Sequence, residues 1–564
     1  MKKMSLRIIL FSLILFNLLQ FNTYGQVGYV PVEDEIYHYL DRMNILGFLS
    51  DYNSFEIPKS RKSIKNYLSN LLNVQHKLDK IDRKKLSYFL NEFELDIKSS
   101  LSMSESLYPN FDFGYLDSEK EKYLYAYSDS SDFSIFINFV GKLDYLHQSD
   151  IELHKNSNST LYRFGGEIRT SFFNNIGFSL TTTNGSFFGD KDLTQKFSSL
   201  KYNYKFNRTT GSELGENYFD ETSAFLMYEN DYLKLKIGND RKLIGHGNHK
   251  VFLSNNAPRM EYIGLDLQYK IFSFSFFHGK LLGNQTITYD SEQGSVNKVS
   301  DKYLAYHRFG LNFSKHLQIG LGEMIVYANR NLDFSYLNPF NFYKSAEHAN
   351  QDRDNTFLFF DIQNNSIEGL KFYSNVLIDD IDFGKFGQGW YGNQTLINIG
   401  MYSSLLYKYL PLDFEIQYIK VDPYVFTHRI YDNNFTSLNY SLGSTLEPNS
   451  SSSRILIYYR PHHRVSIVSG FAYTHHGANV IDIDGKLITN YGGNILQGHR
   501  PSDSEEVYFL GGEREVFREY KIETIIEPIK NWIFSINLNY NNNSLSRSQH
   551  SEELFTTFSL YTKL

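Results

Sequence analysis

The chain has 564 residues, a formal net charge of −7 and no cysteine, and 16% of its residues are aromatic. The aromatic fraction argues against a disordered protein, and the missing cysteines exclude disulfide scaffolds, thiol nucleophiles and Cys-ligated zinc. The mild negative charge argues against a nucleic-acid partner. No run of about 20 apolar residues follows residue 25, so a bundle of transmembrane helices is excluded as well.

The first segment has the parts of a secretory signal peptide. A basic start precedes an apolar run at residues 8–19, and small residues occupy the third and first positions before Gln26. A run of about a dozen apolar residues is too short to span a bilayer. We therefore predict that residues 1–25 are a cleaved signal peptide and that the mature protein begins near Gln26, outside the cytoplasm and without a lipid anchor.

The next segment has helical periodicity. Its apolar sets are Ile36, Leu40 and Met43, then Ile64, Leu68 and Leu71, then Leu86, Phe89, Leu90 and Phe93. Ser60 and Asp79 are suited to cap the second and third helices. We predict that residues 26–105 form a small periplasmic helical domain. Its basic faces are interpreted as solvated surface, with contact to peptidoglycan, lipid headgroups or a periplasmic partner as the alternative.

Beyond Tyr108 the apolar period switches to two and stays so to the C-terminus. The clearest alternation places Leu412, Phe414, Ile416 and Tyr418 between Asp413, Glu415 and Gln417. Residues 233–237 and 532–540 show the same pattern. Such alternation is typical of strands with one apolar and one largely polar face.

The connections between these strands alternate in length. Tight polar turns such as residues 230–231 join strands in pairs, whereas longer polar stretches such as 285–301, 379–393 and 482–506 separate the pairs. This alternation is typical of an outer-membrane barrel, so residues 106–564 are predicted to form a large antiparallel outer-membrane β-barrel of about 18 strands. A soluble sandwich or propeller is the alternative. The export signal and the aromatic strand ends favour the barrel.

Three stretches of the barrel region resemble a known family. They are residues 241–264, residues 323–361 with the motifs Tyr336-Leu337-Asn338-Pro339 and Asp352-Arg353-Asp354-Asn355, and residues 424–448. Together with the order of signal peptide, helical domain and barrel, they resemble the capsule-assembly family called Wzi, in its divergent form from Bacteroidota. The resemblance implies an outer-membrane barrel that holds capsular or exported polysaccharide at the cell surface, without catalysis.

Candidate metal ligands are sparse. His246 and His249 lie in the sequence GHGNH, where flanking glycines favour a loop, so we interpret them as a surface-loop pair rather than as a metal site. Asp352 and Asp354 offer hard oxygens, but the rest of a calcium loop is absent. We predict no bound metal and no cofactor.

No catalytic residues are predicted either. The sequence contains neither a recognisable Ser-His-Asp arrangement nor a glycine-rich phosphate loop. Neighbouring acids such as Asp379 and Asp380, or Glu505 and Glu506, are interpreted as solvated loop acids, because adjacency in sequence says nothing about separation across a sugar. We therefore expect a protein that is not an enzyme.

Saccharide binding needs aromatic rings for the apolar faces of sugars and planar polar groups for their hydroxyls. The candidates are Trp390, Tyr391 and Asn393 in one loop, with Arg259, Arg353, His428 and Arg429 for an acidic polymer. In the alternative interpretation, the two aromatics belong to an interfacial girdle and the arginines pair with acids in the lumen.

These observations predict an outer-membrane barrel that binds or anchors capsular polysaccharide or exopolysaccharide at the cell surface and assists capsule assembly. Its expected partners are that polysaccharide and the outer-membrane lipids. The alternative function is that of a porin or substrate-specific channel, since a large barrel with a polar inner face suits both roles.

Overall fold

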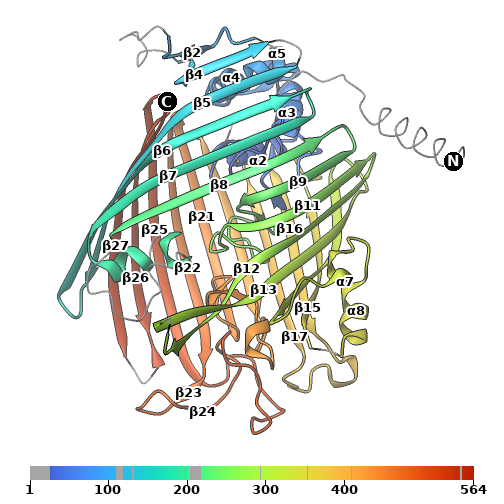
Figure 1. The fold of residues 1–564 in the computed structure, drawn as a ribbon, viewed down its shortest axis with the longest axis vertical. Helices are drawn as coiled ribbons and strands as arrows, with labels where there is room; N and C mark the ends of the chain where they lie inside the picture. The colour runs from blue at the N-terminus through green and yellow to red at the C-terminus, as the bar shows by residue number, and fades with distance from the viewer. Residues whose placement is uncertain are drawn as a thin grey trace, which may run out of the picture.

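The computed structural model describes residues 26–98, 100–109, 119–129, 132–196, 199–202, 217–292, 294–351, 353–407, 409–546 and 549–564. The predicted signal peptide, residues 1–25, lies outside the described residues. Within them, the chain forms a small group of helices followed by one large closed sheet (Figure 1).

Eighteen strands close into a ring in which each strand pairs antiparallel with the ring strands before and after it. They are β5 (Phe133–Asp150), β6 (Lys155–Phe172), β7 (Ile176–Gly189), β8 (Tyr218–Glu229), β9 (Leu233–Asp240), β11 (Met260–Tyr269), β12 (Phe272–Asp290), β13 (Gly294–Asn312), β14 (Leu317–Ala328), β15 (Asn355–Asn364), β16 (Leu370–Asp380), β17 (Gln394–Ser403), β18 (Leu412–Val421), β21 (Ser450–His462), β22 (Val465–Ala478), β25 (Glu513–Ile529), β26 (Trp532–Ser544) and β27 (His550–Lys563). Strand β27 closes the ring by pairing with β5, with Lys563 opposite Val140. A short strand, β4 (Tyr125–Asp129), pairs with the first residues of β5. The predicted antiparallel barrel of about 18 strands is confirmed.

Apolar side chains of the ring point outward and polar side chains point into the lumen. On β18, Ile416 and Tyr418 are each 43% exposed on the outside, whereas Asp413 and Glu415 are buried inside. An exposed apolar belt around a polar interior is typical of a barrel that spans a membrane. The closed ring also excludes the sandwich and propeller alternatives.

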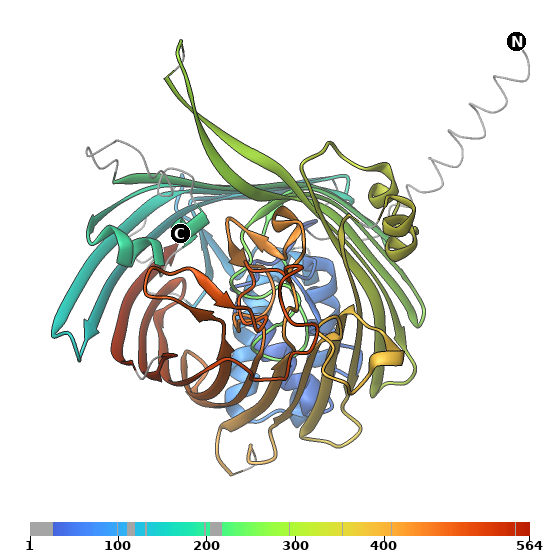
Figure 2. The ribbon, with the colours of Figure 1, turned by 90° about the horizontal axis from the view of Figure 1, so that it is seen from below.

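The two ends of the ring differ in their connections. At the short-turn end, tight turns such as residues 230–232 and 530–531 join the strands. At the long-loop end lie the described residues of the connections 190–217, 241–259, 329–354, 381–393, 422–449 and 479–512. Figure 2 views the barrel from this second end, with the loops 422–449 and 479–512 lying across the centre of the ring.

The loop predicted at residues 285–301 is wrong, because this segment continues the ladder between β12 and β13. Both strands extend beyond their neighbours into a hairpin that projects from the ring (Figure 2). The segment is polar, but it includes Thr286, Thr288, Val296 and Val299, and these residue types favour strand backbone. Gly294 supplies the turn with a φ of +75°, a conformation that glycine adopts without strain.

In the described part of the chain four helices precede the barrel, and their predicted apolar residues are buried except Leu90, which is partly buried. The helices are α2 (Ile36–Ile45), α3 (Arg61–Asn73), α4 (Lys80–Glu92) and α5 (Glu94–Lys98). Their shared core contains Ile36, Leu40, Met43, Ile64, Leu68, Leu71, Leu86, Phe89 and Phe93. Both predicted caps are present, since Ser60 accepts a hydrogen bond from the Ser63 amide and Asp79 accepts one from the Asp82 amide.

Smaller elements complete the described structure. Three short helices lie in the connections, namely α6 (Lys191–Lys196), α7 (Phe334–Leu337) and α8 (Tyr343–Ala349). The two-stranded pairs are β1 (Glu56–Ile57) with β10 (Leu243–Ile244), β2 (Ser104–Ser106) with β3 (Glu121–Tyr123), β19 (Thr436–Ser437) with β20 (Tyr440–Ser441), and β23 (Val480–Ile481) with β24 (Leu487–Thr489). Among the described residues, no helix combines the length and the apolar character that crossing a bilayer requires.

The helices dock against the short-turn end of the barrel through buried ion pairs. The Arg42 guanidinium lies 3.1 Å from Asp82 within the helices and also contacts Asp413 of β18. Asp413 is fully buried and contacts Arg460 of β21 as well. Lys371 of β16 lies 2.5 Å from Asp41 of α2. One barrel carboxylate therefore neutralises two arginines and joins the helical domain to the wall.

We expect Asp413→Ala to release the helical domain from the barrel. The substitution leaves Arg42 and Arg460 without this buried partner, and breaking a buried pair costs about 3–5 kcal/mol. Limited trypsin digestion of the purified protein should then remove residues 26–98 quickly, while the barrel keeps its heat-modifiable migration. Glu519→Ala, which removes a half-exposed partner of Arg454, serves as the control and should digest like the parent. Equal digestion of all three proteins would contradict the assigned role of Asp413.

Candidate functional site

Two loops at the long-loop end are joined by backbone contacts. Trp390 in the loop 381–393 forms a β-bridge with Glu506 in the loop 479–512. The Tyr391 amide donates to the carbonyl of Glu505 at 2.9 Å, and the Val507 amide donates to the carbonyl of Gly389 at 2.7 Å. The predicted aromatic pair is therefore held against the loop that lies across the mouth of the barrel (Figure 2).

The joined loops carry a cluster of aromatic rings. The rings of Tyr391 and His499 are stacked, with centroids 3.6 Å apart and an angle of 9° between them. Tyr424, from the loop 422–449, meets both rings edge-on at 5.9 and 5.4 Å. The Trp390 ring lies 5.4 Å from Tyr391 and has the Lys385 ammonium 4.2 Å from its centroid. Trp390 and Tyr391 remain partly exposed, so their rings are accessible to a ligand.

Planar polar groups lie next to this cluster. Arg500 donates two hydrogen bonds to Asp503, at 2.9 and 2.7 Å, and Asn490 donates a third at 2.9 Å. Burial acts to raise the pKa of Asp503, but the hydrogen bonds from Arg500 and Asn490 lower it below its ordinary value. The Asp503 carboxylate is charged but its side chain is only 3% exposed, whereas the Arg500 guanidinium that it holds is 39% exposed beside the stacked rings. The guanidinium can donate hydrogen bonds to hydroxyl groups and to a ligand carboxylate.

Of the other residues predicted to bind saccharide, some lie near this aromatic cluster and others lie elsewhere. Asn393 shapes the loop, since its side chain accepts a hydrogen bond from the Asp382 amide and donates one to the Lys385 carbonyl. His428 lies beside the loop 479–512, because its carbonyl is close to Gly498.

The arginines of the predicted set are all exposed. Arg429 follows His428, and the Arg353 carbonyl accepts a hydrogen bond from Asn433 in the loop 422–449. Arg259 lies at the start of β11, and none of the described contacts joins it to the aromatic cluster.

Sequence reasoning missed Tyr424, His499, Arg500 and Asp503. In the sequence, the adjacent residues His499 and Arg500 in the long loop 479–512 are a weak indication of a ligand-binding site. Their relation to Tyr391 comes from a contact between loops more than 100 residues apart, which no local pattern in one sequence reveals.

Two segments enter the lumen from opposite ends and fill the sector lined by β11 to β18. Residues 53–59 reach inward from the helical domain, and the connection 241–259 folds inward from the long-loop end. They pair as β1 and β10, and the Gly245 amide donates to the Phe55 carbonyl at 2.9 Å. The Lys250 ammonium donates to the carbonyl of Ser54 at 2.8 Å. These two segments are called the plug below.

Histidines 246 and 249 belong to the plug, so their interpretation as a surface-loop pair is wrong. His246 is buried, with Nε2 3.1 Å from an oxygen of Asp361, which also accepts two hydrogen bonds from Arg308. Burial lowers the pKa of His246 to about 4. The loop turns inward because its polar groups find partners on the lumen wall, such as the Asn375 side chain that accepts from the His246 amide. Among the described residues, no cluster of three metal-ligating side chains occurs.

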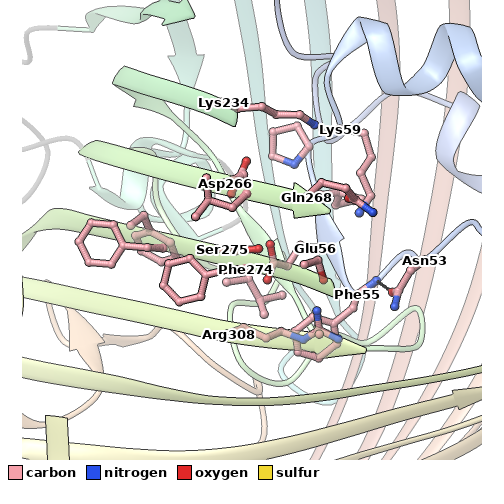
Figure 3. Close-up of a pocket in the computed structure, with 18 of the residues that line it drawn as sticks. Asn53, Phe55, Glu56, Lys59, Lys234, Asp266, Gln268, Phe274, Ser275 and Arg308 are labelled. Atoms are coloured by element: carbon pink, nitrogen blue, oxygen red, sulfur yellow. Dashed lines mark hydrogen bonds between the residues drawn. The ribbon is translucent and has the colours of Figure 1, made fainter. Parts of the chain in front are cut away.

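A cavity of about 150 Å³ lies between the helical domain and strands β9, β11, β12 and β13 (Figure 3). Its polar lining includes Lys59, Asp266, Gln268 and Arg308, and the plug residue Phe55 lines it as well. Residues of the β8–β9 turn line its other end, so the cavity lies between the plug and the short-turn end.

No family model matches the sequence, and no curated protein matches it. The fold is similar to the solved structure of Wzi, described as an outer-membrane protein involved in group 1 capsule assembly in Escherichia coli and as a carbohydrate-binding β-barrel. That similarity has 11% identity, a TM-score of 0.55 and coverage of 94% of this chain and 99% of that chain. Pseudomonas aeruginosa OprD has 9% identity, a TM-score of 0.43 and coverage of 76% and 93%. Pseudomonas aeruginosa OpdK with vanillate has 10% identity, a TM-score of 0.43 and coverage of 76% and 99%. These likenesses concern the fold.

Proposed function

We propose that this protein is a non-enzymatic outer-membrane barrel that holds capsular or exported polysaccharide at the cell surface and assists capsule assembly. The observation that carries the proposal is the cluster of Tyr391, His499 and Tyr424 with neighbouring planar polar groups, placed over a plugged lumen. A plugged barrel with a sugar-compatible outer surface suits retention of a polymer better than its passage.

The membrane placement is supported by the wall of the barrel. Its outward side chains form an apolar belt, and the sequence begins with a predicted export signal. Outer-membrane barrels have short periplasmic turns and long outer loops. We therefore infer that the helical domain faces the periplasm and that the aromatic cluster faces the outside of the cell.

The ligand class is supported by the chemistry of the cluster. Sugar rings present apolar C–H faces that pack on aromatic rings, and their hydroxyls pair with planar amide, carboxylate and guanidinium groups. Trp390 and Tyr391 supply accessible rings, and the Arg500 guanidinium, held in place by Asp503, supplies a planar donor group. The similar Wzi barrel is itself described as binding carbohydrate.

A channel is the second candidate, and one observation favours it. The inward-facing residues Asn537, Asn539 and Asn541 of β26 are partly exposed, whereas inward residues of β15 and β18 are buried under the plug. One sector of the polar lumen wall is therefore packed less tightly than the other. A channel function would require this sector to conduct past the helical domain.

We expect Tyr391→Ala and His499→Ala each to weaken binding of the strain's own polysaccharide to the purified protein. Loss of one stacking ring costs about 1–3 kcal/mol in base–aromatic contacts, which corresponds to roughly 5- to 150-fold in affinity. Tyr409→Ala, an exposed aromatic at the short-turn end, is the matched control and should bind normally. Unchanged binding by both cluster variants would argue against this surface as the site.

The exposed arginines give a separate expectation for an acidic polymer. Arg353→Gln and Arg429→Gln should weaken binding at low ionic strength and have little effect at high salt, because salt screens exposed charges and shortens the Debye length from about 30 Å at 0.01 M to about 3 Å at 1 M. Titrating the purified variants with polysaccharide at several salt concentrations measures this. An effect that is independent of salt would indicate that the arginines act through loop structure instead.

The intact protein is expected to show negligible single-channel conductance in planar bilayers, because the plug and the helical domain block the lumen. Deleting residues 31–99 removes the helical domain and half of the plug, and it should raise the conductance. Deleting the hairpin tip 285–301, which projects from the ring, is the control and should leave the conductance low. Large and stable conductance in the intact protein would move the proposal to the channel.

A further inference from the structure

The apolar belt of the barrel is interrupted over strands β12 to β14. His307 of β13 pairs in register with Glu323 of β14, two positions from the exposed pair Phe309 and Leu321 on the same face. His278 of β12 faces outward as well. These three polar side chains lie on the outer wall, yet they are only 2–5% exposed. Part of the chain must therefore cover them from outside the ring.

The cover is the connection 329–354, whose helices α7 and α8 lie outside the ring in both views (Figures 1 and 2). The ring of Tyr343 stacks on His307 at 4.4 Å. The amides of Tyr343 and Lys344 donate to the Glu323 carboxylate at 2.8 and 3.3 Å. The wall thus supplies hydrogen-bond partners to the backbone of the cover.

A second set of contacts fixes the part of the cover nearest the rim. His278 Nε2 lies 2.7 Å from the hydroxyl oxygen of Tyr327, which accepts a hydrogen bond from the Asp333 amide. Arg330 and Asp354, close to the two ends of the connection, form a double hydrogen bond at 2.6 and 2.7 Å. Polar contacts therefore hold the cover on the wall, and the packed side chains of the cover surround these contacts.

The cover reaches well down the wall from the long-loop end. Phe313 lies at the short-turn end, just after β13, and His307 lies six residues before it. At about 3.3 Å per residue and a tilt of about 40°, six residues rise roughly 15 Å, within an apolar belt about 25 Å tall. Phe340 of the cover stacks on Phe274, which pairs with Phe309. With the same rise per residue and the same tilt, the pair of Phe274 and Phe309 lies roughly 10 Å above Phe313 along the barrel axis.

The outer face of the cover is apolar. Leu332, Phe334, Phe340 and Phe342 are between 51% and 86% exposed. In water this would be a patch of exposed large hydrophobics, whereas at the depth of the belt it continues the apolar surface of the barrel. Backbone at that depth needs internal hydrogen bonds, and the helical turns together with Glu323 provide them for α8.

We propose that residues 329–354 form a re-entrant element embedded among the acyl chains of the outer leaflet, where it seals a polar window in the barrel wall and anchors the barrel in the lipid. The inference rests on the membrane placement in the proposed function and is independent of polysaccharide binding. Its partner is the hydrocarbon of the outer leaflet. The exposed phenylalanines continue the lipid-facing belt, and His278, His307 and Glu323 are kept away from lipid by the cover.

The test uses tryptophan fluorescence with brominated lipids. The sequence contains two tryptophans. A starting protein with both Trp390→Phe and Trp532→Phe has no tryptophan emission of its own. Phe340→Trp is then introduced and the protein is reconstituted into phosphatidylcholine vesicles with brominated acyl chains. Ile399→Trp on the exposed outer face of β17 is the lipid control, and Ile483→Trp between β23 and β24 is the aqueous control. We expect loss of emission at positions 340 and 399, and none at 483.

Other outcomes distinguish the re-entrant placement of the cover from the membrane placement of the barrel. Emission at position 340 that is lost to aqueous iodide and not to brominated lipid, with position 399 quenched by lipid, overturns the re-entrant placement and leaves the barrel in the membrane. Emission at 340 insensitive to both quenchers means that a second copy or another protein covers this face, which also overturns lipid as its partner. Absence of lipid quenching at 399 overturns the membrane placement in the proposed function itself.

A second experiment tests the sealing role. Replacing residues 331–351 with a short Gly-Ser linker exposes the polar window to lipid and should reduce the fraction of heat-modifiable, folded barrel after reconstitution. Adding His278→Leu, His307→Leu and Glu323→Leu to that variant replaces all three polar side chains of the window and should restore the folded fraction. An undiminished fraction in the linker variant, or no recovery with the three leucines, overturns the sealing role.

Discussion

The pairing of β1 with β10 inside the lumen is the contact on which the arrangement of this barrel depends. A segment from the helical domain and a connection from the opposite end meet there through backbone hydrogen bonds, and Phe55 packs among His246, Phe252 and Phe359. An 18-strand ring without such a filling would leave a wide lumen, because the diameter of a barrel grows with its strand number. The plug occupies the sector of that lumen lined by β11 to β18.

Polar side chains of the lumen wall that lie under the plug are paired with hydrogen-bonding groups of the plug. Buried polar groups are costly unless they are hydrogen-bonded, and the inward residues under the plug find such partners. Asp361 binds Arg308 and His246, while Glu415 accepts from Tyr373 and from the amide of Asn248. The same rule holds on the outer wall, where Glu323 accepts from the amides of the cover. In both places a connection from the long-loop end supplies the partners that a polar stretch of wall requires.

Much of the fold follows from local patterns in the sequence. Alternation marked strands such as β18 and β26, helical spacing marked α2 to α4, and Ser60 and Asp79 marked two helix starts. These features depend on neighbours within a few residues, so a single sequence contains them. The hairpin β12–β13 was missed beyond Gly283 because polar strands and polar loops have similar compositions.

The candidate site was predicted less completely, because it arises from contacts between distant loops. Trp390 and Tyr391 could be proposed from their residue types, whereas the stacking of Tyr391 on His499 depends on how two connections meet. The inward turn of residues 241–259 and the outward position of α7 and α8 have the same origin. Each connection is placed by the polar groups that the strands offer it, and these groups come together only when the ring closes.

We propose that the surface formed by the aromatic cluster at the long-loop end retains polysaccharide that the cell makes by other means. The most direct test is a clean deletion of the gene, followed by measurement of polysaccharide bound to cells and polysaccharide released into the medium. We expect an unchanged total amount of polysaccharide with a shift from the cells to the medium, reversed by the intact gene. An unchanged distribution between cells and medium in the deletion strain would contradict it.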